Sequence, residues 1–167
     1  MAFTDALLPE FDHETGVTRR LLERLPDDKF GWKPHDKSMT LGRLASHVAE
    51  CLTWLTETVL KTEVNWNTTK PSSAKVCASR AETLAYFDDA QKSARAALAA
   101  ASDAELLQSW TFKKDGQVVF SQPRIGVIRG MVFNHMIHHR GQLSVYLREN
   151  NVPLPAMYGP SADEGGS

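Results

Sequence analysis

Apolar residues recur every three or four positions along four long segments of the chain, the spacing that gathers them on one face of an α-helix. The predicted helices cover about residues 4–25, 40–60, 79–101 and 123–150. Pro26 follows the first helix, and Pro123 suits the first turn of the last one. Ser79 and Glu82 form a capping box at the start of the third.

Two of the segments that connect these helices have sequence patterns that predict their structure. The segment 61–78 is rich in Asn, Thr and Ser, so it predicts a loop that crosses the surface between the second and third helices. After a short helical turn near Ser102, the runs 110–112 and 118–120 flank Asp115-Gly116, a dipeptide that favours tight turns. We therefore expect a small β-hairpin before the last helix.

The length and the pattern fit one compact domain. A chain of 167 residues with 42% hydrophobic residues can bury a substantial core without a second domain. We expect residues 1–155 to form that domain and residues 156–167, which end in Asp-Glu-Gly-Gly-Ser, to form a flexible tail. The four long helices predict an all-α fold, a four-helix bundle.

Charge and hydropathy point away from nucleic acid and membranes as partners. The 19 Lys and Arg residues nearly balance the 20 Asp and Glu residues, and no long run of one sign occurs. No apolar run approaches a membrane span, and the N-terminal sequence lacks the features of a signal peptide. We expect a cytoplasmic protein whose two cysteines, Cys51 and Cys77, are buried or bystander thiols.

Three of the six histidines fall within residues 135–139, inside the last predicted helix. His135 and His139 are one helical turn apart and project from the same face, close enough to share a metal ion. His47 lies at the edge of the apolar stripe of the second predicted helix, so it can also face the core. A buried polar group without a partner costs about 1–3 kcal/mol, and metal binding removes that cost.

The histidines leave two interpretations open. Three neutral nitrogen ligands suit zinc, nickel or ferrous iron, with the remaining positions filled by water or substrate. The alternative is a metal-free helical protein whose histidines satisfy one another through buried hydrogen bonds. Removal of metal ions would leave the stability of such a protein unchanged.

The histidine motifs resemble those of the DinB family. The resemblance rests on His47-Val48-Ala49-Glu50 and on His135-x-x-His138-His139-Arg140-Gly141-Gln142, and it extends over nearly the whole chain. It implies that His47, His135 and His139 are metal ligands in a four-helix bundle of up-down-down-up order, with residues 61–78 as a long crossover. The superfamily also includes metal-dependent S-transferases that use low-molecular-weight thiols.

Two neighbours of these histidines are candidate catalytic residues. His138 lies about 60° from His135 around the helix, so it either lines the pocket as a proton-transfer group or forms a hydrogen bond at a helix seam. Glu50 lies one turn from His47 and either orients that ligand, acts as a base, or is a solvated carboxylate.

The open metal position suggests a reaction class. A bound divalent ion lowers the pKa of a coordinated thiol or water, which supports S-transfer or hydrolysis. No motif for a protein nucleophile or a phosphate loop is present in the sequence. We expect a small-molecule substrate or thiol as partner and a homodimer as the default assembly. The alternative function is a non-catalytic metal-binding protein of stress-response or interaction type.

Overall fold

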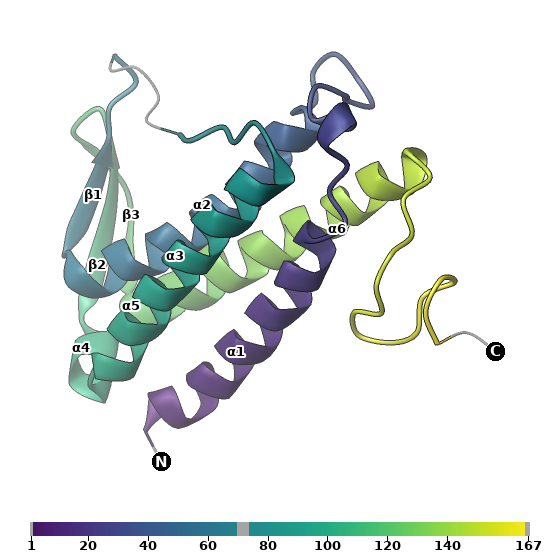
Figure 1. The fold of residues 1–167 in the computed structure, drawn as a ribbon. Helices are drawn as coiled ribbons and strands as arrows, with labels where there is room; N and C mark the ends of the chain where they lie inside the picture. The colour runs from purple at the N-terminus through teal and green to yellow at the C-terminus, as the bar shows by residue number, and fades with distance from the viewer. Residues whose placement is uncertain (1, 70–73, 166–167) are drawn as a thin grey trace.

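The computed structural model describes residues 2–69 and 74–165 and consists of long helices with a small sheet at one side (Figure 1). The four predicted helical segments are confirmed. The long elements are α1 (Phe3–Leu22), α2 (Leu41–Leu60), α3 (Arg80–Ala100) and a last helix divided into α5 (Arg124–Val127), η2 (Ile128–Asn134) and α6 (His135–Glu149). The short elements are η1 (Asp27–Lys29) and α4 (Asp103–Leu107).

Side chains cap three of the helices at their N-terminal ends. The hydroxyls of Thr40, Ser79 and Ser102 accept hydrogen bonds from backbone N–H groups in the first turns of α2, α3 and α4. These bonds satisfy donors that have no partner within the helix, so they fix where each helix begins. No helix in the described part of the chain is both long and apolar enough to cross a membrane.

A three-stranded sheet completes the fold. Its strands are β1 (Glu63–Trp66), β2 (Ser109–Lys114) and β3 (Gln117–Pro123), in the order β1-β2-β3. Strands β2 and β3 are antiparallel and joined at Asp115 and Gly116, whose φ angles are 48° and 82°. Two positive φ angles are what a tight hairpin turn requires, so the predicted hairpin is present.

The expectation of an all-α four-helix bundle is wrong, because the sheet makes the fold mixed. The difference lies in the segment 61–78, where β1 pairs in parallel with β2. Glu63-Val64-Asn65-Trp66 is too short to show a clear alternating pattern. Its strand conformation depends on β2, which lies far along the chain, and such long-range pairing is not encoded locally.

The two faces of the sheet differ in polarity. Val64, Phe112 and Phe120 are partners across the three strands, and the ring centroids of Phe112 and Phe120 lie 5.7 Å apart. On the other face Ser121 Oγ lies 2.8 Å from Ser109 Oγ and 3.0 Å from Thr111 Oγ1. Because side chains alternate along a strand, the sheet has one apolar face and one hydroxyl-rich face.

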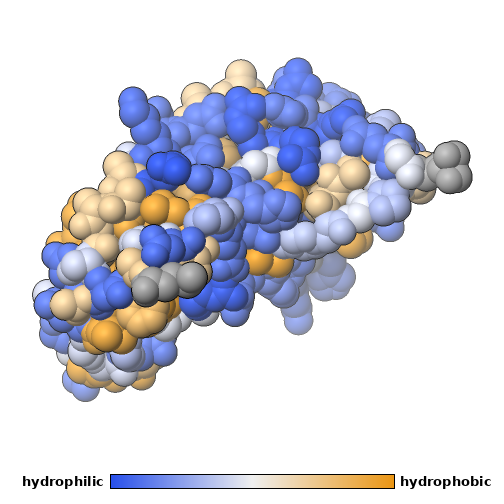
Figure 2. Space-filling view, turned by 90° about the horizontal axis from the view of Figure 1, so that it is seen from below, coloured by the Kyte–Doolittle hydropathy of each residue, from blue (hydrophilic) through white to orange (hydrophobic). Residues whose placement is uncertain are grey.

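Apolar surface is concentrated at the end of the molecule that carries the sheet and α4. Figure 2 shows orange surface gathered toward that end, on the left, whereas the rest of this face is mostly polar. Exposed apolar residues of the elements at this end are Leu60, Trp66, Leu107, Val118 and Val119.

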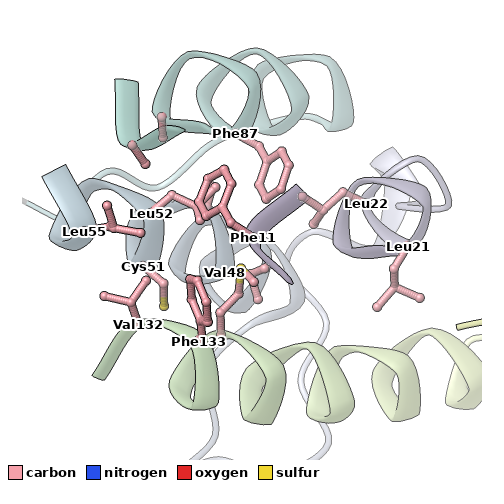
Figure 3. Packing of buried hydrophobic residues seen from close by; sticks show 14 of the residues in the cluster. Phe11, Leu21, Leu22, Val48, Cys51, Leu52, Leu55, Phe87, Val132 and Phe133 are labelled. Carbon is pink, nitrogen blue, oxygen red and sulfur yellow. The ribbon is translucent and has the colours of Figure 1, made fainter. Parts of the chain in front are cut away.

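The helices meet in one hydrophobic core. Helix α2 packs against α3, η2 and α6, and α1 packs against α3 and α6. Phe11 of α1, Phe87 of α3 and Phe133 of η2 are fully buried around Leu52 of α2 (Figure 3). Each such side chain contributes about 1.5–3 kcal/mol relative to an exposed one, so α2 is held rigidly at the centre.

A buried arginine ties the sheet end of the helices together. Arg124, only 5% exposed, donates to the carbonyl oxygens of Thr58 and Lys61 at the end of α2 and of Glu105 in α4. It also donates to Oε1 of Gln108, which precedes β2. This clamp fixes the start of α5 against the end of α2.

The C-terminal segment contacts the helices on the side away from the sheet (Figure 1). The hydroxyl of Tyr158 donates to Glu14 Oε2, and the carboxylate of Asp163 pairs with Arg148. Glu14 in turn pairs with Arg140 Nη2 at 2.8 Å. The flexibility expected for residues 156–167 stays a prediction.

Candidate metal centre

Three histidines from two helices converge beside the core. His47 lies in the N-terminal half of α2, His135 is the first residue of α6, and His139 follows one turn later. The Nε2 atom of His135 lies 3.1 Å from Nε2 of His47 and 2.9 Å from Nε2 of His139. One ligand atom from each residue lies within 4.8 Å of the others, so the group could hold a metal ion.

The backbone immediately before His135 is a π-helix. Residues Ile128–Asn134 form this wider helical segment between α5 and α6. A π-helix changes the angular register of the residues that follow it, and such segments are frequent at functional sites. The sequence pattern predicted one continuous α-helix here, because the apolar stripe through Ile128 and Val132 has ordinary helical spacing.

The other ring nitrogen of two histidines is already occupied. Glu50 Oε2 lies 2.8 Å from Nδ1 of His47, and Gln142 Oε1 lies 2.7 Å from Nδ1 of His139. Both oxygens are acceptors, so each Nδ1 carries the hydrogen. The Nε2 atoms of His47 and His139 therefore present lone pairs toward His135.

This tautomer pattern favours a cation over hydrogen bonds among the histidines. A neutral His135 has one N–H to offer, and its Nε2 faces two acceptors at 3.1 and 2.9 Å. A single N–H satisfies only one of these acceptors, so the lone pair of the other histidine is left without a donor, which is unfavourable in a partly buried site. A metal ion among the three Nε2 atoms satisfies all of them at once.

Burial favours the neutral form of His135 and His139. Desolvation, with a smaller effect of the neighbouring histidines, lowers the pKa of His135 to about 4. Desolvation also lowers the pKa of His139, against the opposing hydrogen bond with Gln142. Neutral imidazole is the form that binds a metal, so His135 and His139 could bind one near pH 7 without losing a proton.

Glu50 is held as a carboxylate by two donors. Arg43 Nη2 donates to Glu50 Oε2 at 3.0 Å, the same oxygen that lies near His47. Burial raises the pKa of Glu50, but the hydrogen bonds from His47 and Arg43 outweigh it and the net pKa is lowered. A charged carboxylate against Nδ1 strengthens His47 as a ligand.

The indole of Trp54 packs against two histidines of the cluster. The ring of Trp54 lies 5.4 Å from that of His47 and 5.3 Å from that of His135, measured between centroids. His47 and His139 are both 8% exposed. The site is thus shielded from bulk water, which strengthens its electrostatic interactions.

A cavity of about 680 Å³ reaches the cluster, and we name it the sheet cavity. It is lined by His47, Glu50 and Trp54 of α2, Val64 and Phe112 of the sheet, and Val132 of η2. Its volume is in the range that accommodates small-molecule ligands. A molecule in it would have direct access to His47.

Five residues were singled out from the sequence. The structure places three of them, His47, His135 and His139, in one cluster of ring nitrogen atoms. Glu50 lies behind His47, in the position of an orienting group. His138 is exposed and lies outside the cluster, with its ring 5.0 Å from that of His139. Sequence reasoning did not identify the roles of Arg43 and Gln142, because polar residues on helix surfaces give no distinct signal.

The two cysteines are buried, as the sequence predicts. Cys51 Sγ donates to the carbonyl oxygen of His47, and burial together with the charge of Glu50 raises its thiol pKa to about 12. A thiol in this state is a poor nucleophile. Cys51 is therefore poorly suited to act as a nucleophile at the site.

The long helices and the three-histidine group define a largely helical protein with a candidate metal centre. The DinB family model matches residues 1–165. The chain belongs to the DinB family.

Similar proteins have been found in Bacillus species. The chain is 24% identical over 163 residues to the uncharacterized protein YrdA of Bacillus subtilis strain 168, with 96% of this chain and 90% of YrdA covered. A DinB-like crystal structure from Bacillus cereus ATCC 10987 has a TM-score of 0.72 at 23% identity, covering 94% of this chain and 98% of that one. The DinB-like protein YjoA of Bacillus subtilis gives 0.68 at 18%, covering 90% and 96%. At these identities the two structures show a shared fold.

Proposed function

We propose that the protein binds one divalent metal ion through the Nε2 atoms of His47, His135 and His139 and is a metal-dependent thiol S-transferase. The observation that carries this proposal is the set of Nε2 atoms that face one another while Glu50 and Gln142 occupy the Nδ1 atoms of His47 and His139. Zinc, nickel and ferrous iron all suit three imidazole ligands.

The chemistry supplied by a bound metal is a nucleophile near neutral pH, because a divalent ion lowers the pKa of a thiol or a water molecule. The residues of the chain hold and shield the site. Glu50 fixes the His47 ring by accepting its Nδ1–H, and Arg43 holds Glu50 in turn. Trp54 limits the access of water to His47 and His135.

The size of the sheet cavity is compatible with S-transfer. Hydrolysis needs space for one substrate and a water molecule, whereas S-transfer needs space for a thiol and an electrophile. A cavity of about 680 Å³ beside His47 has that space. The inert state of Cys51 is consistent with a low-molecular-weight thiol as cosubstrate.

A metal-dependent thiol assay tests the proposal. Protein loaded with zinc, nickel or ferrous iron would be mixed with glutathione, cysteine or coenzyme A and with 4-nitrobenzyl chloride, and loss of thiol would be followed. We expect turnover that requires both metal and thiol and that disappears in His135→Ala. Circular dichroism would show that this variant remains helical, and Cys51→Ala is the control that should retain activity.

Two other outcomes of such assays would support an alternative function instead. If the metal-loaded protein consumes no thiol above the uncatalysed rate and hydrolyses 4-nitrophenyl acetate instead, the S-transfer proposal is wrong and hydrolysis takes its place. If it does neither while it still binds metal, the non-catalytic metal-binding function is supported.

A further inference from the structure

We propose that the sheet cavity binds an uncharged amphipathic molecule, with its polar reacting group at His47 and its aromatic or branched apolar tail beneath the sheet. The inference rests on the proposed function in that it names the class of electrophile that the site would take. The evidence for the inference is the composition of the cavity walls, the distribution of charge along the cavity and the length of the cavity.

Three elements form the walls. Helix α2 contributes residues along one side, from Arg43 to Thr58. The apolar face of the sheet contributes Val64, Trp66, Trp110 and Phe112, and α5 with η2 contributes Val127, Met131 and Val132. The sheet thus covers the helices with aromatic side chains, which are the usual lining of ligand pockets.

The lining changes from polar to apolar along α2. Arg43, His47 and Glu50 lie toward its N-terminal end, beside the histidine cluster. Trp54 follows, and the sheet residues cover the C-terminal part of the helix near Thr58, where Arg124 anchors α5. At 1.5 Å per residue, His47 and Thr58 are separated by about 16 Å along the helix. A ligand that spans this path must have one polar and one apolar end.

Three polar residues elsewhere in the lining already have partners, namely Glu57, Asn65 and Asn67. Glu57 pairs with Lys61 at 2.5 Å, and Asn65 Oδ1 accepts the backbone N–H of Gly116 at 3.0 Å. The Asn67 side chain accepts hydrogen bonds from Thr69. The indole Nε1–H of Trp110 is buried and has no partner among the described residues, so the end beneath the sheet favours a mostly apolar tail that can carry one hydrogen-bond acceptor.

Charge argues against an electrophile with an anionic tail beneath the sheet. The guanidinium of Arg43 is paired with Glu50 at 3.0 Å, and the second carboxylate of the lining, Glu57, is paired with Lys61, which is not part of the lining. Phosphate or carboxylate groups would meet this carboxylate-rich lining at a desolvation cost without a free cationic partner among the described lining residues. The expected ligands are neutral aryl or branched-alkyl compounds.

The experiment uses a homologous series of neutral probes: benzyl alcohol, 2-phenylethanol, 3-phenylpropanol and 4-phenylbutanol. Binding would be followed by the ¹⁵N–¹H signals of the tryptophan indoles. Trp54, Trp66 and Trp110 line the cavity, whereas Trp32 packs edge-on against Tyr146 at 5.4 Å and is the internal control. We expect shifts in the first three signals alone, and an affinity that rises about fourfold for each added methylene.

A pair of valine variants locates the probe. Val64→Trp fills the cavity from β1, and Val119→Trp places the same side chain on the exposed surface of β3. We expect Val64→Trp to weaken 4-phenylbutanol binding at least tenfold and Val119→Trp to leave it unchanged. Met131→Trp, which fills the cavity from η2, serves if Val64→Trp does not fold.

Equal shifts of Trp32, an affinity independent of chain length, or equal effects of the two valine variants would overturn the proposal. The measurement would be made on protein as purified and again after chelation, which separates the two proposals. If the protein binds 4-phenylbutanol but never binds metal, the proposal for the sheet cavity is supported and the proposed function is wrong. If it binds metal but no phenylalkanol, the proposal for the sheet cavity is wrong and the metal site is supported.

Discussion

The carboxylate of Glu50 lies 2.8 Å from Nδ1 of His47, three residues away on the same helix. This contact determines which nitrogen of His47 faces the other two histidines. The lone pair on Nε2 exists because the hydrogen is held on Nδ1, and the carboxylate is the group that holds it there.

Glu50→Gln tests this relationship. The amide keeps the size of the side chain but removes the charge, so we expect metal affinity to fall about tenfold to a hundredfold. Isothermal titration with zinc measures the change. Glu57→Gln, a carboxylate two turns further along α2 that pairs with Lys61, should leave the affinity unchanged. Equal affinities of Glu50→Gln and the native protein would show that the contact does not tune the site.

The metal-free protein should lose stability in mild acid. The pKa of His135 is about 4 in the folded state, below its ordinary value of about 6.5, and that of His139 is lowered in the same direction. Above pH 6.5 both histidines are neutral in the folded and in the unfolded chain, so their lowered pKa values do not affect stability. Between pH 6.5 and 4 the unfolded chain binds protons that the folded chain does not, so unfolding is favoured.

Urea unfolding at pH 7.5, 6.5, 5.5 and 4.5 in the presence of a chelator measures this effect. The comparison is with His135→Gln, whose side chain does not titrate. We expect the native chain to lose stability more steeply than the variant as the pH falls. Parallel curves would contradict the account of the buried imidazole.

The buried ion pair between Arg140 and Glu14 should dominate the stability of the α1–α6 contact. The two side chains are 2% and 9% exposed, and Arg140 also donates to Thr18 Oγ1. Arg140→Met leaves the carboxylate buried without its partner, and we expect a loss of about 3–5 kcal/mol in the free energy of unfolding.

An exposed arginine provides the control. Arg95 pairs with Asp12 between α3 and α1, with side chains 49% and 44% exposed, so Arg95→Met should have a much smaller effect. Adding Glu14→Met to Arg140→Met should recover part of the loss, because it removes the unpaired charge. Guanidinium unfolding checks both statements, and similar losses for the two arginine variants would refute them.

Cys51 should be chemically inert in the folded protein. With a pKa of about 12, it is almost wholly protonated at pH 8, and we expect its reaction with iodoacetamide to be about a thousandfold slower than in the denatured chain. Mass spectrometry of labelled peptides measures the two rates. Rapid labelling of the native protein would place a reactive thiolate beside the site.

Much of the architecture followed from local pattern. The helices were predictable because their apolar residues recur at one spacing, and the hairpin because Asp115-Gly116 is a strong turn signal. Strand β1 was not, since its conformation depends on pairing with Phe112 and its neighbours in β2. The π-helix before His135 was also missed, because a segment of seven residues is too short for its apolar spacing to distinguish the two helix types.

The candidate site was also predictable from the sequence only in part. His135 and His139 were paired by their spacing on one helix, and His47 by its place on an apolar stripe. Arg43 and Gln142 could not be assigned, because their roles depend on oxygen and nitrogen atoms that meet only in the folded chain. Spacing predicts which side chains share a face, but not which of them make hydrogen bonds.

The most direct test of the metal centre is elemental analysis of tag-free protein beside its histidine variants. We predict about one metal ion per chain in the native protein and its loss from His47→Ala and His139→Ala, with helicity retained by circular dichroism. His138→Ala, which alters a histidine outside the cluster, should keep the metal. A native protein that stays metal-free after reconstitution with zinc, nickel and ferrous iron would contradict the account.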